Sequence, residues 1–126
     1  MKITPILFLD AIEPALPFWV DRLGFTKTGE VPDGDRLAFA MFALGETEVM
    51  LQTHESAKKD NAAFVADYRA CLFVQFDSFD EVLKRLDGWP VEMPVRDTFY
   101  GLREIGVLAP GGHLLVFAAP IPAATV

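Results

Sequence analysis

Cysteine is nearly missing from the sequence, since Cys71 is the single one among 126 residues. An intramolecular disulfide is therefore impossible, and a zinc site built from four cysteines is excluded. Long apolar runs are missing too. The apolar stretch 3–9 is followed by Asp10 and Glu13, where a signal peptide would carry small neutral residues, and no stretch approaches the ~20 apolar residues of a membrane span. We expect a cytoplasmic protein with no membrane partner.

Positive charge is scarce. The chain has 11 Lys and Arg against 18 Asp and Glu, a net charge of −7, and no basic cluster longer than Lys58-Lys59. Nucleic-acid binding requires a basic surface that neutralises phosphates, so we expect no nucleic-acid partner. The composition is 52% hydrophobic and 23% charged, which is typical of a packed core. These values favour a single domain, residues 1–126, with a neutral or cationic small molecule as its ligand.

The hydrophobic pattern of the first half predicts a strand, a helix and three more strands. The predicted strands are 3–9, 25–31, 36–44 and 48–53, with a turn at 32–35 and a hairpin loop at 45–47. The helical stripe comprises Ile12, Ala15, Leu16, Trp19, Val20 and Leu23, and it ends at Gly24. Pro14 and Pro17 fall near the first turn, where backbone N–H groups lack partners, so they should cost the helix little.

The pattern repeats after a polar connector, residues 55–69. Adding 67 to Ile12, Ala15, Leu16 and Trp19 gives Phe79, Val82, Leu83 and Leu86, a second helical stripe that follows the apolar strand 71–76. The same offset relates Arg36 to Arg103 and Gly45 to Gly112. We therefore predict an α+β fold of two tandem βαβββ modules, about 3–54 and 70–119, which form a curved mixed sheet around a cavity. The concave side is the expected place of function.

Two segments of the sequence are similar to signatures of a known family. Residues 18–25, Phe-Trp-Val-Asp-Arg-Leu-Gly-Phe, resemble the first-helix signature of the vicinal oxygen chelate superfamily, which includes glyoxalase I, extradiol dioxygenases and bleomycin resistance proteins. Residues 100–104 and 109–113 resemble its aromatic-Gly-Arg-Glu strand and its following hairpin, although Leu102 is an inserted residue. The resemblance spans about 3–119 and implies the same paired βαβββ modules.

The resemblance also implies where a metal would bind. Metal-dependent members place a His or Glu on the first and last strand of each module, and the matching positions here are Ile3, Leu51, Cys71 and Val116. One thiol and three alkyl groups do not form a coordination site. We therefore predict no metal, no cofactor and no catalytic residue, as in the bleomycin resistance proteins, which sequester a drug in clefts across a homodimer.

Two other functions are open at this point. One is a metal-dependent lyase, isomerase or dioxygenase with a non-standard site that uses His54, Glu48 or Cys71. The other is a structural or regulatory protein whose cavity is filled by its own side chains. The preferred interpretation is a homodimer that binds a small organic molecule, such as a cationic or planar antibiotic, without metal catalysis.

The candidate ligand-binding residues are Phe39, Met50, Gln52, Phe99, Tyr100 and Arg103. Phe99 and Tyr100 precede Gly101 at the start of a strand, a position suited to stacking on a planar ligand. Phe39 shares a strand face with Met41, and Met50 shares one with Gln52. Gln52, like Gln75, is a polar residue within an apolar strand, so it needs a partner that a ligand could supply.

Several of these residues also have an ordinary structural interpretation. Arg103 and Glu104 could form ion pairs with a neighbouring strand rather than bind a ligand. Cys71 is expected to be a small buried hydrophobe. His54 and His113 are expected on the solvated surface.

Overall fold

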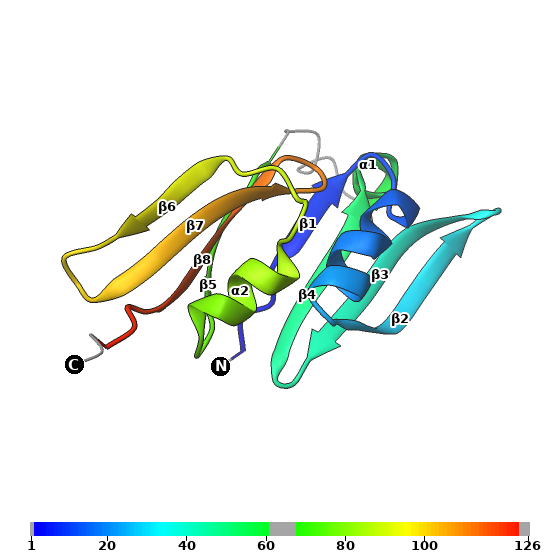
Figure 1. Ribbon diagram of the computed structural model, residues 1–126. Coiled ribbons are helices and arrows are strands. Elements are labelled where there is room, and N and C mark those ends of the chain that lie inside the picture. Colours follow the sequence, from blue (N-terminus) through cyan, green and yellow to red (C-terminus); the bar gives the residue numbers. More distant parts are fainter. Residues whose placement is uncertain (1, 61–67, 124–126) are drawn as a thin grey trace. The chain divides into compact units, whose positions relative to one another are not determined.

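The computed structural model describes residues 2–60 and 68–123. The chain forms two compact units, Met1–Ala70 and Cys71–Val126, and each holds one four-stranded mixed sheet (Figure 1). The α+β fold of two βαβββ modules is confirmed. In the described residues, no helix is long and apolar enough to cross a membrane.

The first unit has the sheet order β1-β4-β3-β2. Its strands are β1 (Ile6–Leu9), β2 (Thr26–Asp33), β3 (Arg36–Leu44) and β4 (Thr47–Thr53), and its helices are η1 (Glu13–Ala15), η2 (Pro17–Arg22) and α1 (His54–Asp60). β1 pairs with β4 in parallel, whereas the β2–β3 and β3–β4 pairs are antiparallel. α1 replaces the start of the predicted connector, and the stretch 61–67 of that connector lies outside the described residues.

The first helical segment departs from the regular helix that its stripe predicts. Residues 13–15 form a 3₁₀ turn and residues 17–22 a π-helical turn, in which the Leu23 N–H bonds the Phe18 carbonyl five residues back. Proline cannot donate a backbone hydrogen bond, so Pro17 interrupts the regular pattern one turn into the segment. Ile12, Ala15, Trp19 and Leu23 of the stripe are buried, together with Phe18, whereas Leu16 and Val20 are only partly buried.

The two faces of the first sheet differ in burial. Alternate residues point to opposite faces of a strand, and one set is buried almost completely beneath the η1–η2 segment. This set comprises Leu7, Leu9, Ala40, Phe42, Val49 and Leu51. On the other face, Phe39 lies beside Gln52, and Met41 lies beside Met50. We call this second face, formed by Ile6, Phe8, Phe39, Met41, Met50 and Gln52, the open face.

The second unit repeats this arrangement with the sheet order β5-β8-β7-β6. Its elements are β5 (Cys71–Gln75), α2 (Phe79–Arg85), β6 (Met93–Asp97), β7 (Leu102–Ala109) and β8 (His113–Pro120). Phe79, Val82 and Leu86 of the predicted stripe are buried, but Leu83 is 43% exposed. The expectation for Leu83 is therefore wrong, because Leu83 lines an open pocket beside Val95 and Arg103.

Two further burial predictions are wrong. Cys71 is exposed because β5 is the edge strand of its sheet and Cys71 belongs to the alternating set of β5 that faces solvent. His113 is buried because it shares an alternating set of β8 with Leu115 and Phe117, both of which are buried in the core. In both cases the strand register outweighs the chemical preference of the side chain.

Gly106 allows β6 to approach β7 closely. A Cβ at Gly106 would lie 2.7 Å from the Cβ of Met93, its partner across the strand pair. Gly106→Ala should therefore lower the free energy of unfolding by about 1–3 kcal/mol, the usual cost of overpacking. Urea denaturation measures this loss in the free energy of unfolding. Gly29→Ala is the matched control, since its Cβ would meet only the Met41 sulfur at 3.7 Å, and an equal loss in both variants would contradict the account.

Candidate functional site

A pocket of about 500 Å³ lies on the open face of the first unit. Its floor is apolar and comes from three strands, whereas its polar rim comes from β4 and α1. The lining residues are Ile6, Val31, Phe39, Gln52, Ser56, Lys59 and Asp60. This size and this combination of an apolar floor with a few polar groups are typical of small-molecule sites.

Gln52 lies at the centre of this arrangement. It is flanked by Phe8 on β1 and by Phe39 on β3, and it is only 8% exposed. Its Nε2 donates a hydrogen bond of 3.2 Å to the Ser56 hydroxyl, which connects the open face to α1. The Ser56 N–H in turn donates to the Thr53 hydroxyl at 3.1 Å, at the first turn of the helix.

Aromatic contacts complete the edge of the open face beside α1. The Phe8 ring packs against His54 and Tyr68, with centroids 6.3 and 6.5 Å apart. His54 is half-buried in this contact, so the expectation of a solvated His54 holds only in part. The contact keeps Phe8 buried while Phe39, Met41 and Met50 stay partly exposed.

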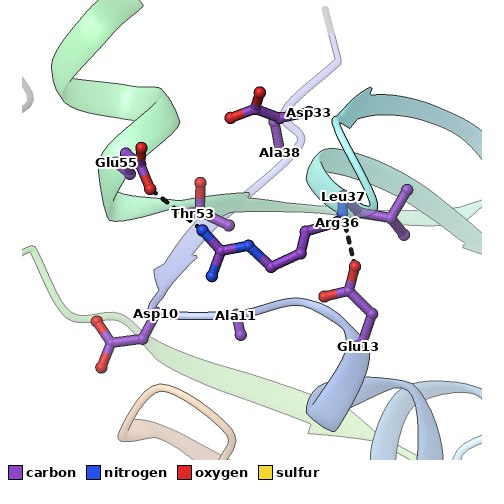
Figure 2. Close-up of a pocket in the computed structure, with 9 residues that line it drawn as sticks. All are labelled: Asp10, Ala11, Glu13, Asp33, Arg36, Leu37, Ala38, Thr53 and Glu55. Carbon is purple, nitrogen blue, oxygen red and sulfur yellow. Dashed lines mark hydrogen bonds and ion pairs between the residues drawn. The ribbon is translucent and has the colours of Figure 1, made fainter.

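A second, polar pocket of the first unit fixes α1 against the strands (Figure 2). Arg36 reaches from the start of β3 to the Glu55 carboxylate of α1 at 3.4 Å, and Lys59 contacts Asp33 at 4.0 Å. The Leu37 N–H donates to the Glu13 carboxylate at 2.6 Å, and this bond lowers the pKa of Glu13. The free volume is only about 10 Å³, about one water molecule, so we assign this cluster to holding α1 in place.

The second unit buries a carboxylate on the face of its sheet opposite to α2. Glu104 is 1% exposed, and it accepts hydrogen bonds from the Tyr100 hydroxyl at 2.6 Å and from Arg96 at 3.0 Å. These bonds, the one from Tyr100 above all, lower the pKa of Glu104, and the same bond to Glu104 raises the pKa of Tyr100. The three side chains therefore form a neutralised, hydrogen-bonded group.

Phe99 and Tyr100 occupy the turn between β6 and β7. Thr98 closes this turn with side-chain and backbone hydrogen bonds to Leu102, and Gly101 adopts a φ of 85°. Phe99 is fully exposed, and its ring meets that of Tyr100 edge to face at 5.0 Å. The turn thus presents two aromatic rings to solvent, as stacking on a planar ligand would require.

Arg103 of β7 lies on the face of the second sheet opposite to Glu104. Its guanidinium donates to the Asp97 carboxylate at 2.7 and 3.1 Å and stacks 5.9 Å from the Phe79 ring of α2. Arg103 and Glu104 point to opposite faces of the sheet, because neighbouring residues of a strand alternate between faces. Arg103 and Glu104 each form an ion pair with the neighbouring strand, as the structural interpretation expects, with Asp97 and Arg96 of β6 as their partners.

The four positions that the family resemblance assigns to a metal are not a ligand set in this fold. Ile3 precedes β1 and is exposed, Leu51 is buried on the face beneath η1–η2, and Cys71 and Val116 lie on neighbouring strands of the second sheet. Leu51 therefore points away from the open face, on which its neighbours Met50 and Gln52 lie. One thiol and three alkyl side chains at these positions do not fit a divalent cation. Within the described ranges no three His, Cys, Asp or Glu side chains are grouped to hold a metal ion.

Sequence reasoning missed the contribution of α1 to the pocket. Ser56, Lys59 and Asp60 fall in the segment predicted to be a connector. This polar segment lacks an apolar helical stripe, so its short helix of seven residues was not predicted. The i, i+4 pair of Glu55 and Lys59, 3.3 Å apart, was a signal that could have indicated it. The central role of Glu104 could have been found from its position as a lone acidic residue in an apolar strand.

Two tandem βαβββ modules define the fold class of this chain. The model of the Glyoxalase/Bleomycin resistance protein/Dioxygenase superfamily matches residues 3–117. The chain therefore belongs to this superfamily, and the resemblance inferred from its two signatures is confirmed.

Solved structures of the same fold include proteins of different function. The chain is similar to the bleomycin-binding protein of bleomycin-producing Streptomyces verticillus, solved with copper(II)-bleomycin, at 24% identity and a TM-score of 0.61, covering 96% of this chain and 97% of that one. It is also similar to lactoylglutathione lyase from Agrobacterium tumefaciens (17% identity, TM-score 0.76, 94% and 92% covered) and to TioX from Micromonospora sp. ML1 (20%, 0.76, 96% and 99%). No curated protein gives a significant match.

Proposed function

We propose that this protein binds a small organic molecule with an apolar, planar body on the open face of the first unit, without metal catalysis. The observation that carries the proposal is the pocket itself, where Phe39 and Ile6 form an apolar floor beside the buried amide of Gln52. In the free protein this apolar floor is exposed to water. A ligand that covers it removes apolar surface from water, which favours binding. Met50 extends the floor along β4.

The finer proposal is drug sequestration, as in bleomycin resistance. It is supported by the likeness to a bleomycin-binding protein and by the net charge of −7, which attracts cations. Phe99 and Tyr100 of the second unit are proposed as a separate place where a planar molecule stacks, because both rings are exposed. A homodimer and a cytoplasmic location are part of the same proposal, the former because exposed apolar side chains outside the pocket, such as Leu44 and Leu108, remain to be covered.

Phe39→Ala should weaken binding of metal-free bleomycin by about tenfold or more, since burial of such a side chain contributes about 1.5–3 kcal/mol. Isothermal titration calorimetry measures this change. Leu83→Ala is the control, because Leu83 is an exposed apolar residue of α2 that does not line this pocket, and it should leave the affinity unchanged.

Two results would contradict parts of the proposal. If the unchanged protein gives no heat with bleomycin at high concentration, drug sequestration is wrong, and the pocket is then tested with a planar aromatic probe. If tag-free protein purified without chelators holds one metal ion per chain, binding without metal is wrong and an enzyme of the lyase or dioxygenase type replaces it.

A further inference from the structure

The turn between β6 and β7, residues 98–101, joins two strands that are cross-linked on both faces of the sheet. On one face, Arg96 of β6 contacts the carboxylate of Glu104 at 2.8 Å. On the other face, Arg103 of β7 contacts the carboxylate of Asp97 at 2.7 Å. The two ion pairs occupy consecutive register positions of the same strand pair. Both hold the end of this hairpin together, so they form a matched pair for comparison.

Glu104 also holds the ring of Tyr100. Its Oε2 accepts a hydrogen bond from the Tyr100 hydroxyl at 2.6 Å, while its Oε1 accepts one from Arg96 at 3.0 Å. The Glu104 side chain is almost completely buried, whereas Tyr100 is 49% exposed. The hydroxyl end of the tyrosine is therefore anchored in the sheet, and part of its ring is left open to solvent.

The anchored ring of Tyr100 supports the neighbouring ring of Phe99. The two rings meet edge to face with centroids 5.0 Å apart, and Phe99 is fully exposed. The backbone of the turn is fixed as well, because the Thr98 hydroxyl donates to the Leu102 carbonyl at 2.9 Å. A side chain that is already ordered in the free protein loses less conformational entropy when a ligand binds.

We infer that Glu104 is a positioning residue, which holds the Tyr100 ring, and through it Phe99, in place before a planar molecule stacks on this turn. The inference rests on the proposed function, in which the turn is a place of stacking. Glu104 does not contact the ligand itself, and it acts by lowering the cost of ordering the ring on binding. This role gives a reason for burying a charged side chain, since apolar residues in place of a buried ion pair are often equally stable.

Tyr100→Phe is the most direct test, because it keeps the ring and removes only the hydroxyl that bonds Glu104. The probe is caffeine, which is planar and neutral, so a change of charge at Glu104 does not act on it directly. Its affinity for the turn is measured from the amide shifts of residues 98–103 during titration of ¹⁵N-labelled protein. We expect Tyr100→Phe to weaken this binding by about threefold to tenfold, the usual cost of immobilising one side chain.

Substitutions at Glu104 and Asp97 separate positioning from stability. Glu104→Leu removes the acceptor and should weaken caffeine binding as Tyr100→Phe does, while Glu104→Gln keeps a carbonyl acceptor and should weaken it less. Asp97→Asn is the matched control, because it changes the ion pair on the other face, and it should leave the affinity unchanged. The ¹³C shift of the Tyr100 Cζ reports the hydrogen bond, and it should change in Glu104→Leu but not in Asp97→Asn.

The outcomes separate the inference from the function on which it rests. Equal caffeine binding by Tyr100→Phe and the unchanged protein would overturn the inference and leave the turn as a binding site. An equal loss of affinity in Asp97→Asn would also overturn it, since the stability of the hairpin would then set the affinity. If millimolar caffeine shifts no amide signal of residues 98–103 in the unchanged protein, stacking at this turn is wrong and the inference fails with it.

Discussion

Trp19→Ala should lower the free energy of unfolding by about 3–5 kcal/mol, the range for removing a large aromatic residue from a core. Trp19 is 1% exposed. Its ring makes edge-to-face contacts with Phe18 at 5.4 Å and with Phe25 at 5.5 Å, so the substitution removes both ring pairs and leaves a cavity between η2 and the sheet. Urea denaturation followed by circular dichroism measures the loss.

Trp19→Phe is the informative companion. The indole Nε1 of Trp19 is buried and has no hydrogen-bond partner within the part of the chain that the structure describes, so phenylalanine removes an unsatisfied donor together with some packing. We expect it to cost far less than alanine. A loss below about 1 kcal/mol for Trp19→Ala, the range of ordinary surface changes, would show that this residue is not at the centre of the core.

Glu104→Gln should remove a pH-dependent part of the stability. The pKa of Glu104 is lowered in the folded protein by the Tyr100 hydroxyl and by Arg96, so its contribution is present above the ordinary value of 4.5 and is lost as the pH falls through the folded pKa. The variant should be clearly less stable than the unchanged protein at pH 7. The difference should shrink towards zero as the pH is lowered from 4.5 through the folded pKa.

Denaturation midpoints at a series of pH values test this expectation. Asp97→Asn is the control, because the pKa of Asp97 is also lowered, by its hydrogen bonds to Arg103, but this pair is more exposed. Its effect should have the same sign and a smaller size, since solvent screens exposed pairs. A Glu104→Gln difference that is constant from pH 7 to pH 3 would contradict the account.

Much of the fold could be predicted because strands and hairpins leave strong local patterns. The strand predicted over 36–44 matches β3, and the hairpin turns at Gly45 and Gly112 lie between paired strands, as the offset of 67 residues predicts. Trp19 is in the core as its helical stripe indicates. These features depend on alternation and on turn chemistry, which act over few residues.

The rest could not be predicted because it depends on register and on partners far along the chain. Arg103 and Glu104 are adjacent in sequence, yet one contacts Asp97 and Phe79 while the other is buried with Tyr100. A shift of one residue in the predicted register reverses such an assignment. Leu51 and Gln52 differ in the same way, since Leu51 is buried in the core while Gln52 lines the pocket.

The strand residues of the candidate site could be predicted, whereas its α1 residues could not. Phe39, Met50 and Gln52 were chosen from faces of adjacent strands, and the structure places them together on the open face. Asp60 and Ser56 reach that face through α1, whose position depends on ion pairs such as Arg36 with Glu55. A contact between two residues 19 positions apart produces no periodic pattern in the sequence.

The most direct test of the central claim is to map the amide chemical shifts of ¹⁵N-labelled protein during titration with naphthalene-2-carboxamidine. The account predicts that the largest shifts fall on the open face and its rim, at Phe39, Met41, Gln52 and the residues of α1, while the η1–η2 segment stays unchanged. Shifts confined to other elements, or no shifts at millimolar probe, would contradict the claim that this face binds the ligand.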